Sequence, residues 1–291
     1  MRSRAILCAA TATLVIAAAA TAEAPERPRG NFGGGVLVAP PRDIFGAGNA
    51  VVALRALKED RLEIEATVRA RCTGGDITAA VKVADDRTFR AEGTETQQPR
   101  GGDKVRTTYR LAGTFTSANA VEGTISATLR RSGDGETETC KTGRISFGAR
   151  RADGRLGKRG AERRARYYGT TAQRGVGPRR PIVLRVSGDG KRISRALFGY
   201  HARCSDGTRT TGIEAPRTEI KIGRTGRVSD RDSGRVQSGG TTTHYDDRFT
   251  AVLGRRGAKG TLSLSDRTLD KATGNVIRSC STGEVKWKAA P

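Results

Sequence analysis

The clearest pattern of apolar and polar positions lies at residues 62–72, LEIEATVRARC. Apolar side chains occupy every second position, namely Leu62, Ile64, Ala66, Val68, Ala70 and Cys72. Such alternation is typical of a β-strand with one buried face. A second strand of this kind is predicted from the alternating Ala196, Phe198, Tyr200, Ala202 and Cys204. After the apolar N-terminal run, no segment shows the 3.6-residue apolar period of a helix. The sequence therefore predicts an all-β protein.

Several short phrases occur twice, in the same order, in the two halves of the chain. The pattern C-x-T-G-x-(I/V)-x-(F/W) occurs at 140–147 and 280–287, ARC plus a turn at 70–75 and 202–207, and G-T-(I/L)-S within 120–129 and 257–265. Self-similarity of this kind indicates a duplicated structural unit. We therefore expect a β domain at 25–148, a basic linker at 149–166 and a second β domain at 167–291.

Each unit has alternating strands separated by glycine-rich and aspartate-rich turns, such as SGDG at 132 and 187. This organisation predicts two tandem, homologous antiparallel β-sandwiches of seven or eight strands. Small β-barrels are the alternative, because some strands are long. An immunoglobulin fold fits poorly, because that fold places a Trp between its two cysteines and here Trp287 follows Cys280.

The first residues have the pattern of a secretory signal peptide. Arg2 and Arg4 precede an apolar run from Ala5 to Ala20, and the small residues Ala20, Thr21 and Ala22 follow. The run is about 16 residues long, short of the ~20 that a membrane span needs. The sequence thus predicts cleavage near Ala22 and a mature chain that is secreted or in the cell envelope, without a transmembrane segment.

Export makes disulfides the expected state of the remaining cysteines, Cys72, Cys140, Cys204 and Cys280. Spacing alone leaves three pairings open. The duplication favours one disulfide within each unit, Cys72–Cys140 and Cys204–Cys280. Zinc binding is a poor fit, because it needs cysteines two to four residues apart.

The repeated C-x-T-G phrase breaks the alternation of its strand. Cys140 is at an even position, whereas Ile145 and Phe147 are at odd positions. A bulge or bend at Thr-Gly would bring all three to the inner face. We interpret the phrase as a closing strand that carries the disulfide, bends at glycine and buries Phe147 or Trp287.

The late C-x-T-G-x-V-x-W phrase and the strand ending in Cys-plus-Gly resemble those of uncharacterised exported β-sandwich repeat proteins of GC-rich bacteria. The resemblance extends over most of residues 32–289 and implies tandem β domains. It implies no established activity.

Candidates for catalysis are few. The two histidines, His201 and His244, are not near a Gly-x-Ser-x-Gly elbow, and His201 is expected on the solvated face of its strand. Carboxylate pairs are found at Asp230 with Asp232 and at Asp246 with Asp247, and charge that solubilises a loop explains them better than glycoside hydrolysis. We expect no catalytic residue, cofactor or metal ligand, and the protein is more consistent with a non-enzyme.

The formal net charge is +23, and residues 149–166 contain eight basic side chains. These candidates for polyanion contact are Arg150, Arg151, Arg155, Lys158, Arg159, Arg163, Arg164 and Arg166. Anionic cell-wall polymers, lipid head groups or nucleic acid are the matching partners. Nucleic acid fits less well, because aromatic residues that would stack on bases are scarce. A solvated linker extended by its own repulsion is the alternative.

The sequence favours an exported, non-enzymatic binding or structural protein of the envelope or extracellular space. It would contact polyanions through the basic linker and the second domain. The alternatives are an extracellular hydrolase with its site in the second domain and a secreted binder of nucleic acid or lipid surfaces.

Overall fold

The computed structural model describes residues 27–36, 48–98, 103–133, 135–173, 177–214 and 219–291. The predicted signal segment lies outside these ranges. The described residues form strands and no helix, and none of them forms a helix suited to crossing a membrane. The all-β prediction is therefore confirmed.

The first half contains nine strands: β1 (Gly30–Val36), β2 (Ala50–Ala56), β3 (Arg61–Arg69), β4 (Gly74–Lys82), β5 (Thr88–Gln97), β6 (Lys104–Ser117), β7 (Ala120–Gly133), β8 (Glu136–Lys141) and β9 (Ile145–Arg150). The second half contains ten: β10 (Arg166–Thr171), β11 (Pro181–Val186), β12 (Arg192–Cys204), β13 (Arg209–Glu214), β14 (Ile220–Lys221), β15 (Arg227–Ser238), β16 (Thr241–Gly254), β17 (Gly257–Asp270), β18 (Val276–Ser281) and β19 (Val285–Ala290).

The two halves have the same sheet topology. The strand order is β4-β3-β2-β1-β9-β7-β6-β5 in the first sheet and β13-β12-β11-β10-β19-β17-β16-β15 in the second. All neighbouring strands in both sheets are antiparallel. Two tandem antiparallel β domains are thus confirmed, and the shared order supports a duplication.

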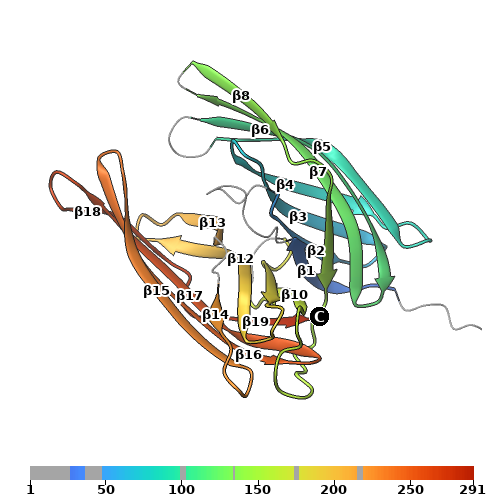
Figure 1. The fold of residues 1–291 in the computed structure, drawn as a ribbon. Coiled ribbons are helices and arrows are strands. Elements are labelled where there is room, and N and C mark those ends of the chain that lie inside the picture. The colour runs from blue at the N-terminus through green and yellow to red at the C-terminus, as the bar shows by residue number, and fades with distance from the viewer. Residues whose placement is uncertain (1–26, 37–47, 99–102, 134, 174–176, 215–218) are drawn as a thin grey trace, which may run out of the picture.

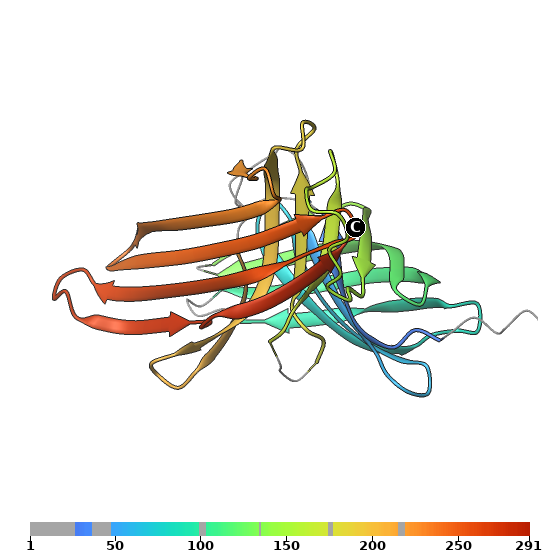
Figure 2. The same ribbon diagram turned by 90° about the horizontal axis from the view of Figure 1, so that it is seen from below.

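Each sheet bends over its own core, so that its two ends face each other. In Figure 2 the long strands β15, β16 and β17 run across the direction of β11 and β12, although all of them belong to one sheet. In the first domain, Leu54 and Ile64 from one arm of the sheet share a core with Leu111 and Ile125 from the other arm. The architecture therefore lies between the predicted sandwich and its barrel alternative.

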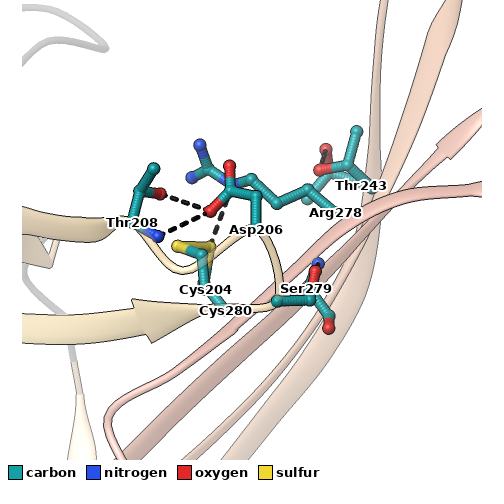
Figure 3. The surroundings of a disulfide bond; sticks show 9 residues. Cys204, Asp206, Thr208, Thr243, Arg278, Ser279 and Cys280 are labelled. Atoms are coloured by element: carbon teal, nitrogen blue, oxygen red, sulfur yellow. Dashed lines mark hydrogen bonds between the residues drawn. A yellow bond between two sulfur atoms is a disulfide. The ribbon is translucent and has the colours of Figure 1, made fainter.

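The second domain is the more completely closed of the two. Strand β18 pairs with β17 and also with β12, where Cys204 lies opposite Cys280. The disulfide Cys204–Cys280 joins these two strands, as Figure 3 shows. In the first domain β8 pairs with β7, and the disulfide Cys72–Cys140 joins the turn between β3 and β4 to β8. The prediction of one disulfide in each domain is confirmed.

The Thr-Gly pair of each C-x-T-G phrase forms the bend between two strands, β8 and β9 or β18 and β19. Gly143 and Gly283 have φ values of +69° and +61°, a left-handed conformation that favours glycine. Ahead of Gly283, the Leu264 N–H donates to Thr282 Oγ1 at 3.0 Å, and the Thr282 N–H donates to the Leu264 carbonyl at 3.0 Å. The threonine thus continues the ladder of β17 across the gap between β18 and β19.

Aromatic rings that lie over glycines in the neighbouring strand recur in both sheets. Six directly opposed pairs are Phe89 with Gly113, Tyr109 with Gly93, Phe147 with Gly123, Tyr200 with Gly212, Tyr245 with Gly234 and Trp287 with Gly260. A Cβ added at any of these glycines would come within 2.9 Å of the aromatic side chain. The missing side chain lets the ring pack on the backbone, which explains part of the high glycine content.

The domains pack back to back through the outer faces of their central strands. Strands β1 and β10 come so close that a Cβ on Gly33 would be 1.9 Å from the Gly169 carbonyl oxygen. Val51 and Val183, which lie outside the two domain cores, are 3% and 2% exposed. Figure 1 shows the two curved sheets diverging from this junction, with the β8 and β18 ends far apart.

We predict that Gly123→Ala destabilises the first domain by about 1–3 kcal/mol, because the new Cβ overpacks the site. That Cβ would be 2.5 Å from both the Ala112 carbonyl oxygen and Phe147 Cζ. Urea unfolding of the full chain measures the effect. Gly240→Ala is the control, because no atom lies within 4 Å of its added Cβ. Equal midpoints for the two variants would refute the role of ring packing on Gly123.

We predict that Thr282→Val lowers the free energy of unfolding by about 1–3 kcal/mol, since it keeps the shape but leaves the Leu264 N–H without its acceptor. Thermal unfolding of the full chain provides the measurement. The control is Thr124→Val, whose hydroxyl makes no hydrogen bond within the described residues. A loss no larger than that of the control would contradict the bridging role of Thr282.

Candidate functional site

The predicted basic linker is an ordered strap across one end of the second domain. Its backbone forms hydrogen bonds from Gly160 N to the Leu253 carbonyl at 3.0 Å and from Arg255 N to the Lys158 carbonyl at 2.9 Å. At its end, Val186 N donates to the Ala165 carbonyl at 2.8 Å. The alternative of a linker extended by its own repulsion is therefore wrong, because the backbone of this segment is hydrogen-bonded to strands and turns of the domain.

The eight basic candidates divide into two groups. Arg150 lies in β9 and donates to the carbonyls of Val121 and Pro291, and its guanidinium sits over the Tyr168 ring. Arg151 donates to Asn119 Oδ1 and to the Arg29 carbonyl. These two arginines hold the start of the strap. The other six are exposed, namely Arg155, Lys158, Arg159, Arg163, Arg164 and Arg166.

The exposed cations of the strap are joined by those of the β16–β17 turn. A Cβ on Gly157 would be 3.0 Å from Arg256 Cγ, which places that side chain against the strap. Two carboxylates lie in the strap, and they make only long ion pairs, Asp153 to Arg155 at 3.3 Å and Glu162 to Arg255 at 3.8 Å. We call this surface, formed by residues 155–166 with Arg255 and Arg256, the basic end.

Most of the charge on the basic end is uncompensated. Within the described parts of the chain, Lys158, Arg159, Arg163, Arg164 and Arg256 form no ion pair. Several like charges held at fixed positions on one surface create a field that attracts anions. The basic end therefore has the charge and the rigidity of a polyanion-binding surface.

A second candidate site is a cleft of about 570 Å³ between the two domains. Its walls come from β3 and β4 on one side and from β12 and β13 on the other. Polar lining residues include Glu65, Thr67, Asp76, Arg180 and Thr211. No sequence pattern pointed to this cleft, because its two walls are more than a hundred residues apart in the chain.

One hydrogen-bonded chain of side chains crosses the junction beside the cleft. Arg180 pairs with Glu65 Oε2 at 2.7 Å and donates through Nε to His201 Nε2 at 2.8 Å. His201 Nδ1 is 2.9 Å from Thr211 Oγ1, and Gln173 bonds the backbone of His201 on both its N–H and its carbonyl. His201 is thus on the outer face of its strand, as expected, but that face is partly buried against neighbouring groups.

The surroundings of His201 keep its imidazole neutral. Burial, reinforced by the nearby charges of Arg180 and Arg209, lowers the pKa of His201 to about 4. Burial also raises the pKa of Glu65, against the opposing effect of Arg180. Because an arginine is only a donor, Nε2 must accept, and Nδ1 carries the proton toward Thr211. His201 therefore cannot take a proton from Thr211, and a Thr–His nucleophile pair does not form.

The aspartates considered as catalytic candidates lie in environments that do not favour acid–base catalysis. Asp246 accepts two hydrogen bonds from Arg231, at 2.9 and 2.8 Å, which lower its pKa. Asp247 lies on the opposite face of β16 and is 6% exposed. Asp230 and Asp232 lie in β15, not in the expected loop. Among the described residues, no group of three or more His, Cys, Asp or Glu side chains is arranged to hold a metal ion.

Comparisons with known proteins add little. No protein-family model matches the chain. No curated protein matches it either. Among solved structures it has a likeness to the crystal structure of kievitone hydratase from Nectria haematococca, with 6% identity over 91% of this chain and 90% of that one. The TM-score is 0.20, which is too low to support an inference about fold or activity.

We predict that protonation of His201 lowers the free energy of unfolding at acidic pH. The unfolded chain binds a proton at His201 below its ordinary pKa of 6.5, whereas the folded chain does so only near pH 4. Its contribution to stability is therefore lost as the pH falls from about 6.5 to 4. The variant His201→Gln retains an acceptor for Arg180 and does not titrate.

Urea unfolding of both proteins at pH 7.5, 6, 5 and 4.5 tests this prediction. The wild type should lose stability relative to His201→Gln as the pH falls, and Glu65 is common to both proteins. A difference between the two that does not change with pH would contradict it.

Proposed function

We propose that this protein is an exported, non-enzymatic binding protein that contacts anionic polymers through its basic end. The supporting observation is the fixed placement of the strap, which presents Lys158, Arg159, Arg163 and Arg164 without acidic partners among the described residues. Export is inferred from the signal-like N-terminus, and the two disulfides are consistent with an oxidising compartment.

The chemistry of the strap favours a linear polyanion over a single small ligand. Its cations are exposed and spaced along residues 155–166, so they match charges repeated along a chain. Binding should release counterions and weaken steeply with salt. Anionic cell-wall polymers are the partners that an envelope protein would meet, and nucleic acid and lipid head groups present related charges.

The alternative of a hydrolase in the second domain receives less support. His201 is neutral and occupied at both ring nitrogens, and Asp246 is paired with Arg231. A binding role needs none of these groups to react.

We predict that replacing Lys158, Arg159, Arg163 and Arg164 together by Gln weakens binding to heparin, the probe polyanion, about ten-fold or more at low salt. The affinity of the variant should also depend less steeply on salt. Affinity-column elution and titration at several NaCl concentrations measure both effects.

The matched control removes four exposed charges from the first domain, by changing Arg90, Lys104, Arg106 and Arg130 to Gln. It has the same net charge as the strap variant and should elute close to the wild type. If the two variants elute together, the basic end is not the binding surface. If the wild type is not retained at low salt on heparin or on purified cell walls, the proposed function is wrong.

A further inference from the structure

Arg195, in β12, is a buried cation without a partner. The residue is 4% exposed, and its Nη1 has no hydrogen-bond partner. No carboxylate among the described residues pairs with it, and the charge that acts on it is that of Arg185. A buried donor of a charged group that is left without an acceptor lowers the free energy of unfolding, so the position of Nη1 needs an explanation.

Two other partly buried arginines each have a carboxylate partner. Arg55 is paired with Glu63, and Arg180 with Glu65. Both arginines reach a carboxylate on β3. Arg195 is more buried than either and lacks such a partner in the described structure. Arg150 and Arg151, which are also partly buried, donate to carbonyl and amide oxygens instead. Arg195 differs from all four because its buried Nη1 has no acceptor of either kind among the described residues.

Arg195 is part of a row of three arginines across β10, β11 and β12. Arg166 lies directly opposite Arg185, and Arg185 directly opposite Arg195. Paired residues of an antiparallel sheet point to the same face with Cβ atoms about 5 Å apart. Leu184 points into the core, so its neighbour Arg185 and the rest of the row point to the outer face.

Exposure decreases along this row. Arg166 is exposed, Arg185 is half-buried and Arg195 is buried. Like charges directly opposite one another destabilise a sheet. A doubly charged oxyanion that entered from the Arg166 end would relieve this repulsion and would give Arg195 the hydrogen-bond acceptor that it lacks. Guanidinium groups match the oxygen geometry of phosphate, with which they form paired hydrogen bonds.

We propose that Arg166, Arg185 and Arg195 form a phosphate-binding site on the outer face of the second domain. The site accepts a phosphate dianion, either as the free ion or as the terminal phosphate of a larger molecule. The proposal does not rest on the polyanion function, because the buried Arg195 carries it and none of the four strap residues changed above belongs to the row.

Titration calorimetry of the full chain with inorganic phosphate and with phenyl phosphate, at constant ionic strength in chloride, tests the site. We expect saturable binding of inorganic phosphate. Binding of phenyl phosphate as well would identify a terminal phosphate group as a ligand, and its failure to bind would assign the site to the free ion. Absence of phosphate binding, or tighter binding of acetate than of phosphate, would overturn the proposal.

Variants connect the binding to the row. Arg195→Met should weaken phosphate binding at least ten-fold, and it should raise the melting temperature in phosphate-free buffer because it removes an unpaired buried charge. Arg185→Gln, at a half-buried position, should also weaken binding if Arg195→Met does not fold. Arg203→Gln, an exposed change on β12, is the control and should bind as the wild type does. Equal binding by all these variants would refute the site.

The two proposals fail separately. The strap variant should lose heparin affinity and retain phosphate binding. Arg195→Met should show the reverse.

Discussion

The bent pair of strands formed by the C-x-T-G phrase, β8–β9 and β18–β19, is the feature on which the rest of the architecture depends. A single sheet encloses a core only if its two arms are held together, and the C-x-T-G phrase does this in four ways. Cys280 joins the opposite arm through the disulfide, Thr282 continues the hydrogen-bond ladder and Gly283 makes the turn. Trp287 then covers Gly260 of the neighbouring strand. The phrase has a folding role in both domains, which explains its repetition without any catalytic function.

Because each sheet closes over its own core, the outer faces of its central strands are available for contacts outside that core. Each domain buries its apolar alternation inside, so the outer residues of β1–β3 and β10–β12 can form the junction between domains. One set of polar groups at this junction is paired, from Glu65 through Arg180 to His201. Arg195 differs because it is buried on an outer face and has no such partner in the described residues.

The strap and the arginine row give the second domain properties that the first lacks. The strap packs on the second domain, and Arg166 is both its last residue and the first member of the row. In the first domain the position that pairs with Arg55 is Glu63, a carboxylate, whereas the position that pairs with Arg185 is Arg195. The two copies thus share a scaffold but differ in charge at this outer position, where the first has an Arg–Glu pair and the second has two arginines. This divergence places the proposed binding functions in the second copy.

The sequence alone determined the strands, the duplication, the disulfide in each domain and the burial of Phe147 and Trp287. These features depend on local alternation and on repeated phrases, both of which can be read along one chain. Tertiary structure decided which outer faces are covered. His201 was expected in solvent, an extended linker was one of two interpretations of the strap, and neither Arg180 nor Arg195 had a sequence signal. The alternation of apolar and polar residues along a strand shows only which side chains point away from the core of their own domain. Whether that side chain then meets water or another domain depends on contacts between residues far apart in the sequence.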